Sequence, residues 1–152
     1  MKLFLRENKD LAETEVEIRY RIKDDEVDAL ISAVNSSADV LIGINEAGDT
    51  ERVFVSGILF FEAVDRDVFA YKTNGIYKVR KTLYELEDDL AGRSFVRISK
   101  STIVNINAVR SAAPEDSRRV KLLLRNGEYL VVSRNYVNGF KAAIGMKGGS
   151  SR

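Results

Sequence analysis

Three consecutive residues, Ser99, Lys100 and Ser101, form the short polar segment of the chain that is best suited to binding chemistry. They interrupt the apolar, β-branched stretch Phe95–Asn105, whose strand-like residues would anchor in a sheet and hold the segment out in solvent. Two hydroxyl groups and an ammonium group raised on a rigid base can donate hydrogen bonds to phosphate oxygen atoms. A Ser-Lys pair could also share a proton in catalysis, but neighbouring strand residues point to opposite faces, which suits that role poorly.

The composition removes most other chemistry, because the chain of 152 residues contains no cysteine and no histidine. Disulfides, thiolate nucleophiles, Cys/His zinc sites and imidazole bases are therefore impossible. We expect a protein that is not an enzyme and that needs no metal and no cofactor.

The distribution of apolar residues bears on localisation. No apolar run approaches the ~18 residues that a membrane-spanning helix needs. Charged residues interrupt residues 1–11, which therefore lack the apolar stretch of a signal peptide. We expect a cytoplasmic protein with no membrane insertion.

The net charge of +1 hides a strong asymmetry along the chain. Residues 1–50 carry 6 Lys/Arg and 12 Asp/Glu, whereas residues 91–152 carry 12 and 3, a net charge of +9. Polyanion binding responds to the local field, so a basic final third is compatible with DNA or RNA binding. Charge alone also fits two halves that pair electrostatically, or charges that are simply solvated.

The acidic N-terminal part predicts a small β-α extension. Val16–Ile22 alternates apolar and charged residues, which is typical of a half-exposed strand. Asp24, Asp25 and Glu26 then favour a helix start, and apolar residues follow at helical spacing from Val27 to Val34. We expect this extension to cover residues 1–45.

From Val40 onward the pattern is mostly β. Val53–Val55 and Ile58–Val64 are apolar enough for buried strands. Asn74-Gly75 and Asn126-Gly127 each lie between strand-like runs and accept positive φ at both central positions of a two-residue turn. Two such hairpins predict an architecture dominated by antiparallel sheet.

Short helices are expected between and after the hairpins. Thr82 and Glu85 form a capping box that predicts a short helix, and a second helix is expected at residues 136–144. Pro114, the only proline, predicts a loop around it. Residues 147–152 have nothing to bury and are predicted to be a disordered tail.

Several of these pieces together resemble the LytTR family of bacterial DNA-binding domains. In chain order they are a strand ending in Ile58–Glu62, a hairpin with the helix from Thr82, then Phe95-x-Arg97 with Ser101-x-Ile103-Val104-Asn105, and finally Val132-Ser133-Arg134-x-Tyr136. The resemblance covers roughly residues 53–146 and is carried by the order and spacing of the pieces.

The resemblance implies a fold and a mode of binding. The fold class would be mainly β, with the antiparallel sheets and short helices of a LytTR-type domain over residues 46–146, preceded by the small β-α extension. The N-terminal part is far too short for a phosphoacceptor receiver domain, so the resemblance implies a stand-alone transcription regulator. Loops of the β scaffold, rather than a recognition helix, would enter the DNA grooves.

Three loops carry over to positions of this sequence. They contain Arg66 in the first, Lys100 and Ser101 in the second, and Arg134 and Asn135 in the third. Arg134 is the candidate for base reading, because a guanidinium fork matches the O6/N7 pair of guanine. Lys100 and Ser101 are better suited to phosphate. Asn135 could contact phosphate or cap the last helix.

Each candidate also has a purely structural interpretation. Arg134 could pair with Glu128, and Lys100 could protect a strand edge against aggregation. Arg66 stands between Asp65 and Asp67, which repel phosphate, so a DNA contact and a solvated turn are equally expected.

Two other residues of the signature are Arg97 and Asn105. Arg97 is as well suited to an ion pair with Glu62 or with a helix acid as to a DNA contact. Asn105 is expected to tie backbone in place.

The resulting hypothesis is a sequence-specific, double-stranded DNA-binding transcription regulator that acts as a homodimer on paired half-sites. Its input could come from a separate sensor or a membrane protein partner. The alternative is a non-catalytic protein-interaction module on the same fold that has lost DNA binding. The acidic N-terminal half favours this alternative.

Overall fold

A computed structural model of the chain describes residues 1–12, 14–37 and 39–145. The tail predicted at residues 147–152 lies outside the described residues. The chain divides into two compact units, Met1–Ala38 and Asp39–Arg152. Among the described residues, no helix is long and apolar enough to cross a membrane.

The first unit contains one helix, α1 (Asp25–Ser37), as the sequence predicts. Asp24 accepts a hydrogen bond from the backbone amide of Val27 over 3.1 Å and so caps the helix. The strand predicted at Val16–Ile22 is not formed, and this prediction was wrong for the single chain. The reason is that a strand needs a neighbour for its backbone groups, and within the described residues none pairs with it.

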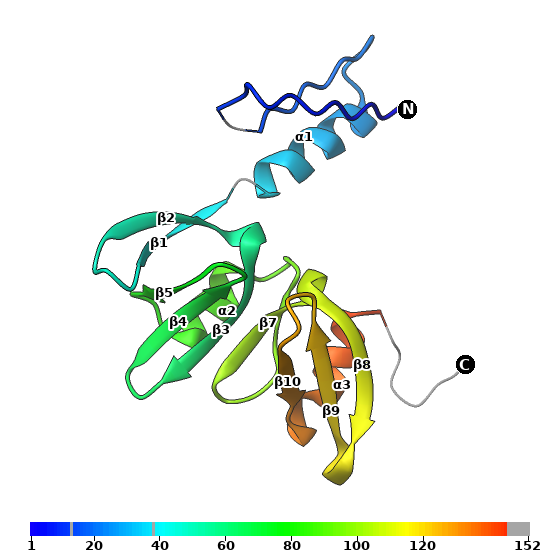
Figure 1. Ribbon diagram of the computed structural model, residues 1–152. Helices are drawn as coiled ribbons and strands as arrows, with labels where there is room; N and C mark the ends of the chain where they lie inside the picture. The colour runs from blue at the N-terminus through cyan, green and yellow to red at the C-terminus, as the bar shows by residue number, and fades with distance from the viewer. Residues whose placement is uncertain (13, 38, 146–152) are drawn as a thin grey trace. The chain divides into compact units, whose positions relative to one another are not determined.

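The second unit begins with a seven-stranded antiparallel sheet in the order β2-β1-β5-β4-β3-β7-β6 (Figure 1). Its strands are β1 (Val40–Ile44), β2 (Thr50–Phe54), β3 (Ile58–Val64), β4 (Asp67–Lys72), β5 (Gly75–Val79), β6 (Phe95–Arg97) and β7 (Thr102–Asn105). Strand β1 pairs along its whole length with β2. The two units therefore divide between residues 38 and 39, ahead of the boundary expected between residues 45 and 46.

A second sheet has three strands in the order β10-β9-β8. They are β8 (Val109–Glu115), β9 (Arg119–Leu124) and β10 (Tyr129–Val132). Pro114 lies inside β8, so the loop predicted around it was wrong. A proline is tolerated there because β8 is an edge strand, where its missing N–H group need not cost a ladder hydrogen bond.

Both predicted hairpins form, but their turns differ from the predicted ones. Lys72 pairs with Gly75, so the first two-residue turn is Thr73-Asn74 rather than Asn74-Gly75. In the second hairpin the Gly127 amide donates to the Leu124 carbonyl over 2.9 Å, and Gly127 has a φ of 93°. This hairpin has a three-residue loop ending in a glycine bulge.

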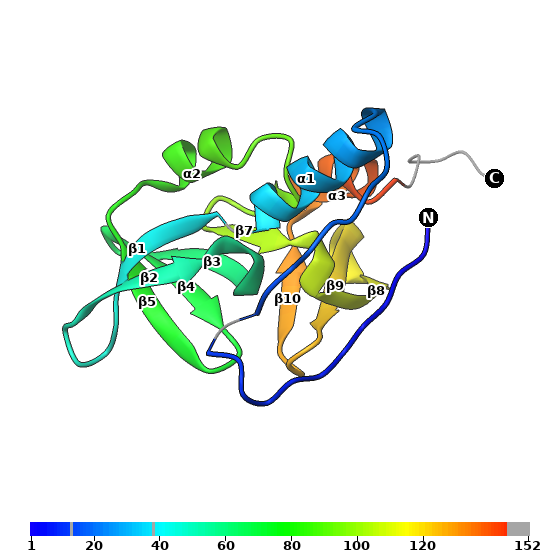
Figure 2. The ribbon, with the colours of Figure 1, turned by 90° about the horizontal axis from the view of Figure 1, so that it is seen from above.

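Two hydrophobic cores share strand β3, whose first four residues are all buried. Phe61 belongs to the core beneath α2 (Leu83–Asp89), and Phe60 belongs to the core that contains Phe140 of α3 (Val137–Ala143). Helix α2 lies over one face of the large sheet (Figure 2). The predicted capping box at Thr82 and Glu85 is confirmed, with both of its hydrogen bonds present.

One half-buried tyrosine joins this core to a charged neighbour. Phe60 and Tyr71 lie opposite each other on β3 and β4, and their stacked rings have centroids 4.4 Å apart. The hydroxyl of Tyr71 donates to Glu62 over 3.3 Å. Burial, followed by the negative charge of Glu62, raises the pKa of Tyr71 above its ordinary value of 10.0.

Candidate nucleic-acid interface

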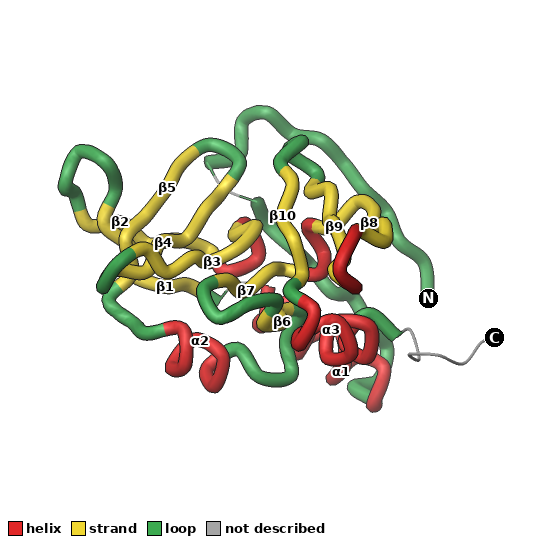
Figure 3. Tube along the Cα trace, turned by 90° about the horizontal axis from the view of Figure 1, so that it is seen from below, coloured by secondary structure: helices red, strands yellow, loops and turns green. Residues whose placement is uncertain are grey.

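The antiparallel pairing brings the three candidate loops to one edge of the domain. They follow β3, β6 and β10. They lie along the lower edge of the second unit in Figure 1, and Figure 3 shows this edge from below. Backbone hydrogen bonds join them: the Ala63 amide donates to Ser101 over 2.8 Å, and the Ser133 amide donates to Ile98 over 2.9 Å. Loops held by ladder-type hydrogen bonds keep a fixed spacing.

The second and third loops line one hollow of about 390 Å³. Lys100, Ser101, Arg134 and Asn135, four of the five candidate residues, all lie around it, together with Ser99, Ser133 and Tyr136. Lys100 and Arg134 are thus on the same surface, although they are far apart in the sequence. Both side chains are exposed.

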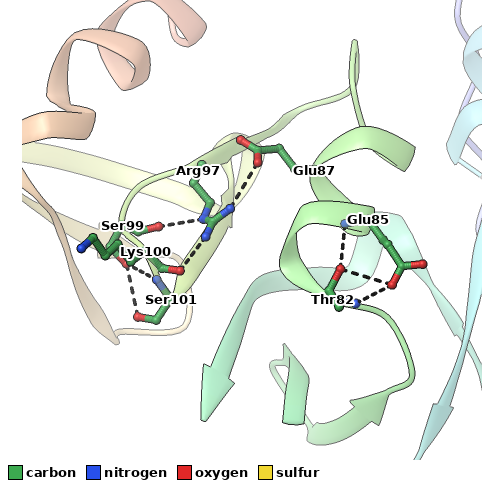
Figure 4. A network of polar contacts seen from close by, with 7 residues as sticks. All are labelled: Thr82, Glu85, Glu87, Arg97, Ser99, Lys100 and Ser101. Carbon is green, nitrogen blue, oxygen red and sulfur yellow. Dashed lines mark hydrogen bonds and ion pairs between the residues drawn. The ribbon is translucent and has the colours of Figure 1, made fainter. Parts of the chain in front are cut away.

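Arg97 organises the second loop from beneath (Figure 4). Its guanidinium donates to the carbonyl oxygens of Ser99 at 2.8 Å and Lys100 at 2.5 Å, and it pairs with Glu87 of α2 at 3.2 Å. The interpretation of Arg97 as the partner of a helix acid is confirmed. Because Arg97 holds the main chain of Lys100, the ammonium group of Lys100 projects from a fixed base.

The hydroxyls of the second loop also stabilise its conformation. The amide of Ser101 donates to the Ser99 hydroxyl over 3.2 Å, and the two hydroxyl oxygens lie 3.4 Å apart. The Ile98 amide donates to the Thr102 carbonyl over 3.0 Å and closes the loop. Ser101 therefore shapes the loop and also lines the hollow.

Lys100 and Arg134 have no hydrogen bond or ion pair from their side chains in the part of the chain that the structure describes. The alternative pairing of Arg134 with Glu128 does not occur; the Glu128 carboxylate instead accepts from Asn126 over 2.6 Å. The two cations are therefore available to a ligand. The solvent around them is not excluded, so each can meet a phosphate or a base edge without first breaking an ion pair.

Asn135 lies in a single 3-10 turn, η4 (Arg134–Tyr136), just before α3. The N-cap of α3 is Tyr136, so the interpretation of Asn135 as the cap is wrong. Its side chain is exposed at the hollow. Asn105, by contrast, is buried and donates to the Ile58 carbonyl over 2.9 Å, which confirms its structural role.

Arg66 lies beside a second hollow, of about 430 Å³, that also includes Lys100. The turn between β3 and β4 has two residues, Asp65 and Arg66, and Asp65 adopts a φ of 57°, a conformation that Asp tolerates better than most residues. Of the flanking acids, Asp67 is paired with Lys78 at 3.3 Å, which offsets part of its repulsion of phosphate.

The second hollow also contains basic residues that the sequence analysis missed. Lys78, Arg80 and Lys81 line it from the end of β5 and the segment that leads to α2. Lys81 is paired with Asp89, whereas Arg80 is exposed and has no ion pair within the described residues. The signal was present: Lys78 and Arg80 alternate with the buried Val79, so both had to point outward.

Within residues 1–12, 14–37 and 39–145, no three carboxylate side chains come close enough together to bind a metal ion. The first hollow presents hydrogen-bond donors and cations, which suits recognition of an anion.

A scaffold of antiparallel sheets that presents exposed cations on adjoining loops is suited to binding a polyanion. A family model described as the LytTr DNA-binding domain matches residues 49–145, and the chain belongs to this family. The resemblance seen in the sequence and the predicted fold class are both confirmed. The family is one of DNA-binding domains rather than of enzymes.

The similar proteins are bacterial. Two from Staphylococcus aureus, strains bovine RF122 / ET3-1 and NCTC 8325 / PS 47, are each 30% identical over 146 residues, which is 95% of this chain and 98% of theirs. Both are named uncharacterized HTH-type transcriptional regulators. A solved LytTr DNA-binding domain from Bacillus cereus has a TM-score of 0.66 and 27% identity, covering 70% of this chain and 97% of that one.

The name given to those relatives contrasts with the architecture of this chain. Its helices α1, α2 and α3 are separated from one another by strands, so within the described residues no two of them form a helix-turn-helix motif.

Proposed function

We propose that this protein is a transcription regulator that binds double-stranded DNA sequence-specifically through the three loops at one edge of its β scaffold. The observation that carries the proposal is that Lys100 lines both hollows, beside Arg134 in one and beside Arg66 in the other. Three loops that are far apart in the sequence thus contribute the cations Arg66, Lys100 and Arg134 to one edge of the domain. A DNA backbone needs such a row of cations.

The side chains of the edge have different roles in this proposal. Arg134 reads a base, because its guanidinium is exposed and able to donate two parallel hydrogen bonds to guanine. Lys100, Ser101 and Asn135 bind phosphate groups and set the register. Arg66 and Arg80 extend the phosphate contacts across the second hollow.

The protein would work as a homodimer on paired half-sites in the bacterial cytoplasm, where its DNA is. One loop module buries little surface, so two copies on one operator raise affinity through effective concentration. The relatives named as transcriptional regulators support this use of DNA binding.

The proposal is tested by selecting bound fragments from random duplex DNA with the full chain, followed by footprinting of the enriched sequence. We expect enrichment of a motif containing guanine and a steep loss of affinity as salt rises. Each phosphate contact should add about −0.9 to the slope of log affinity against log salt. No enrichment and no binding at low salt would favour the alternative, a protein-interaction module on this fold.

A further inference from the structure

The segment Glu15–Ile22 of the first unit has the sequence of a strand, but no described residue pairs with it through backbone hydrogen bonds. Its apolar residues Val16, Ile18, Tyr20 and Ile22 alternate with charged ones. Among the described residues, its backbone amides and carbonyls make no hydrogen bond with other backbone groups. Such a row of free donors and acceptors is a template for pairing with another strand.

The apolar face of this segment is incompletely covered. Val16 is 62%, Tyr20 54% and Ile22 69% exposed. Ile18, Tyr20 and Ile22 lie around a hollow of about 340 Å³ that Val27 and Leu30 of α1 also line. Apolar side chains of this segment and of α1 thus line one hollow, beside the charged Arg19 and Arg21, which marks an interaction surface.

The charges of the segment indicate what covers it. Two acids, Glu15 and Glu17, precede two bases, Arg19 and Arg21, at alternate positions on either side of Ile18. In an antiparallel pair of identical segments centred on Ile18, Glu15 lies opposite Arg21 and Glu17 lies opposite Arg19. Two-fold symmetry makes each of these attractive pairs occur twice.

We propose that the segment Glu15–Ile22 pairs antiparallel with the same segment of a second copy of this chain, in the register centred on Ile18. A parallel pair in register would instead place Glu against Glu and Arg against Arg, which is repulsive. The antiparallel pair satisfies the free backbone groups and brings the apolar residues of both copies together. The α1 face of each copy supplies the further cover that a two-stranded ribbon needs. This inference concerns the first unit and does not rest on DNA binding.

Charge reversal in the full chain tests the proposal by sedimentation equilibrium. The unaltered protein should be a dimer. The double variant Glu15→Arg with Glu17→Arg makes the segment wholly basic, and Arg19→Glu with Arg21→Glu makes it wholly acidic. Each variant alone should dimerise at least about tenfold more weakly, and an equimolar mixture of the two should recover dimers.

Cysteine cross-linking tests the register, because the natural chain contains no cysteine. Ile18→Cys should form a disulfide between copies on mild oxidation, since directly opposite residues lie within disulfide reach. Val16→Cys should not cross-link to itself, because the two positions are offset by about 13 Å along the strands. A mixture of Val16→Cys with Tyr20→Cys should cross-link.

Different results would contradict the dimer and its antiparallel register. A monomer at about 100 μM, or charge variants that dimerise as the natural chain does, would overturn the proposal. Self-cross-linking of Val16→Cys would replace the antiparallel register by a parallel one. Lys100→Ala, which lies in the second unit, is the control and should leave dimerisation unchanged, so a failure of DNA binding does not affect the result.

Discussion

The guanidinium of Arg97 holds the carbonyl oxygen of Lys100 at 2.5 Å while it is itself held by Glu87 of α2 at 3.2 Å. The side chain of Lys100 is therefore presented by a backbone that is fixed from the protein side. A signature arginine acts here beneath the surface that we propose to bind DNA. Its charge is already matched by a carboxylate, so its main effect on binding is through the position of Lys100.

Arg97→Ala should release the second loop and weaken DNA binding to an extent similar to Lys100→Ala. The unfolding free energy should fall by only about 1 kcal/mol, because the lost contacts are partly solvent-exposed. The salt slope should change by much less than one, since Glu87 already neutralises Arg97. Fluorescence anisotropy at several salt concentrations measures both quantities. A slope reduced by a full unit would instead make Arg97 a direct phosphate contact.

Lys100→Ala should weaken binding to all DNA sequences about equally and flatten the salt slope by about one unit. The physical reason is the loss of one cation that displaces one counterion from the backbone. Arg52→Ala is a matched control, because Arg52 is exposed on β2, at the opposite edge strand of the large sheet from the second loop. If the two variants bind alike, Lys100 is not a phosphate ligand.

Arg134→Ala should remove the preference for one base pair of the selected site. The expected cost on that site is about 1–3 kcal/mol, with a much smaller cost on DNA mutated at that pair. Competition binding with the two duplexes measures the difference. Equal losses on both duplexes would assign Arg134 to the backbone rather than to a base.

Arg80→Ala tests whether the second hollow belongs to the DNA-binding edge. Arg80 is exposed and lines this hollow with Arg66 and Lys100. We expect a flatter salt slope by about one unit and an unchanged base preference. A variant that binds with the natural slope would confine the interface to the hollow between Lys100 and Arg134.

Tyr71→Phe tests the electrostatic link between Tyr71 and Glu62. The folded state holds the hydroxyl proton of Tyr71 more tightly than the unfolded state does, because its pKa is raised. Above the unfolded value of about 10 the unfolded chain binds fewer protons, so the unfolding free energy falls as pH rises through the folded pKa. Urea unfolding over this alkaline range should show a shallower fall for Tyr71→Phe. An identical fall in both proteins would remove Tyr71 as its source.

Several local predictions succeeded because their physical causes lie within a few residues. The capping box at Thr82 and Glu85 begins α2 as expected, and Gly92, with a φ of 80°, follows its end. Both hairpins also form where their sequences indicate. The exact turn residues were wrong, because register is set by which residues are buried across the sheet. Val68 pairs with Val79, both in the core, and this register leaves Gly75 inside β5.

For the N-terminal segment, the sequence pattern predicted the wrong local structure. The alternation from Val16 to Ile22 predicts a strand, yet no strand forms in one chain. Periodicity reports which residues favour a pleated surface, but a strand also requires a neighbour for its backbone, and that neighbour is not encoded in the same segment.

The sequence by itself determined the kinds of groups available, the local elements and the family. The absence of histidine and cysteine, the capping box and the order of the signature pieces are all properties of short stretches. Only the tertiary structure decided that Lys100, Arg134 and Arg66 share one edge, and that Arg80 joins them. The physical reason is that antiparallel pairing and the packing of two cores, not sequence proximity, set the distances between loops.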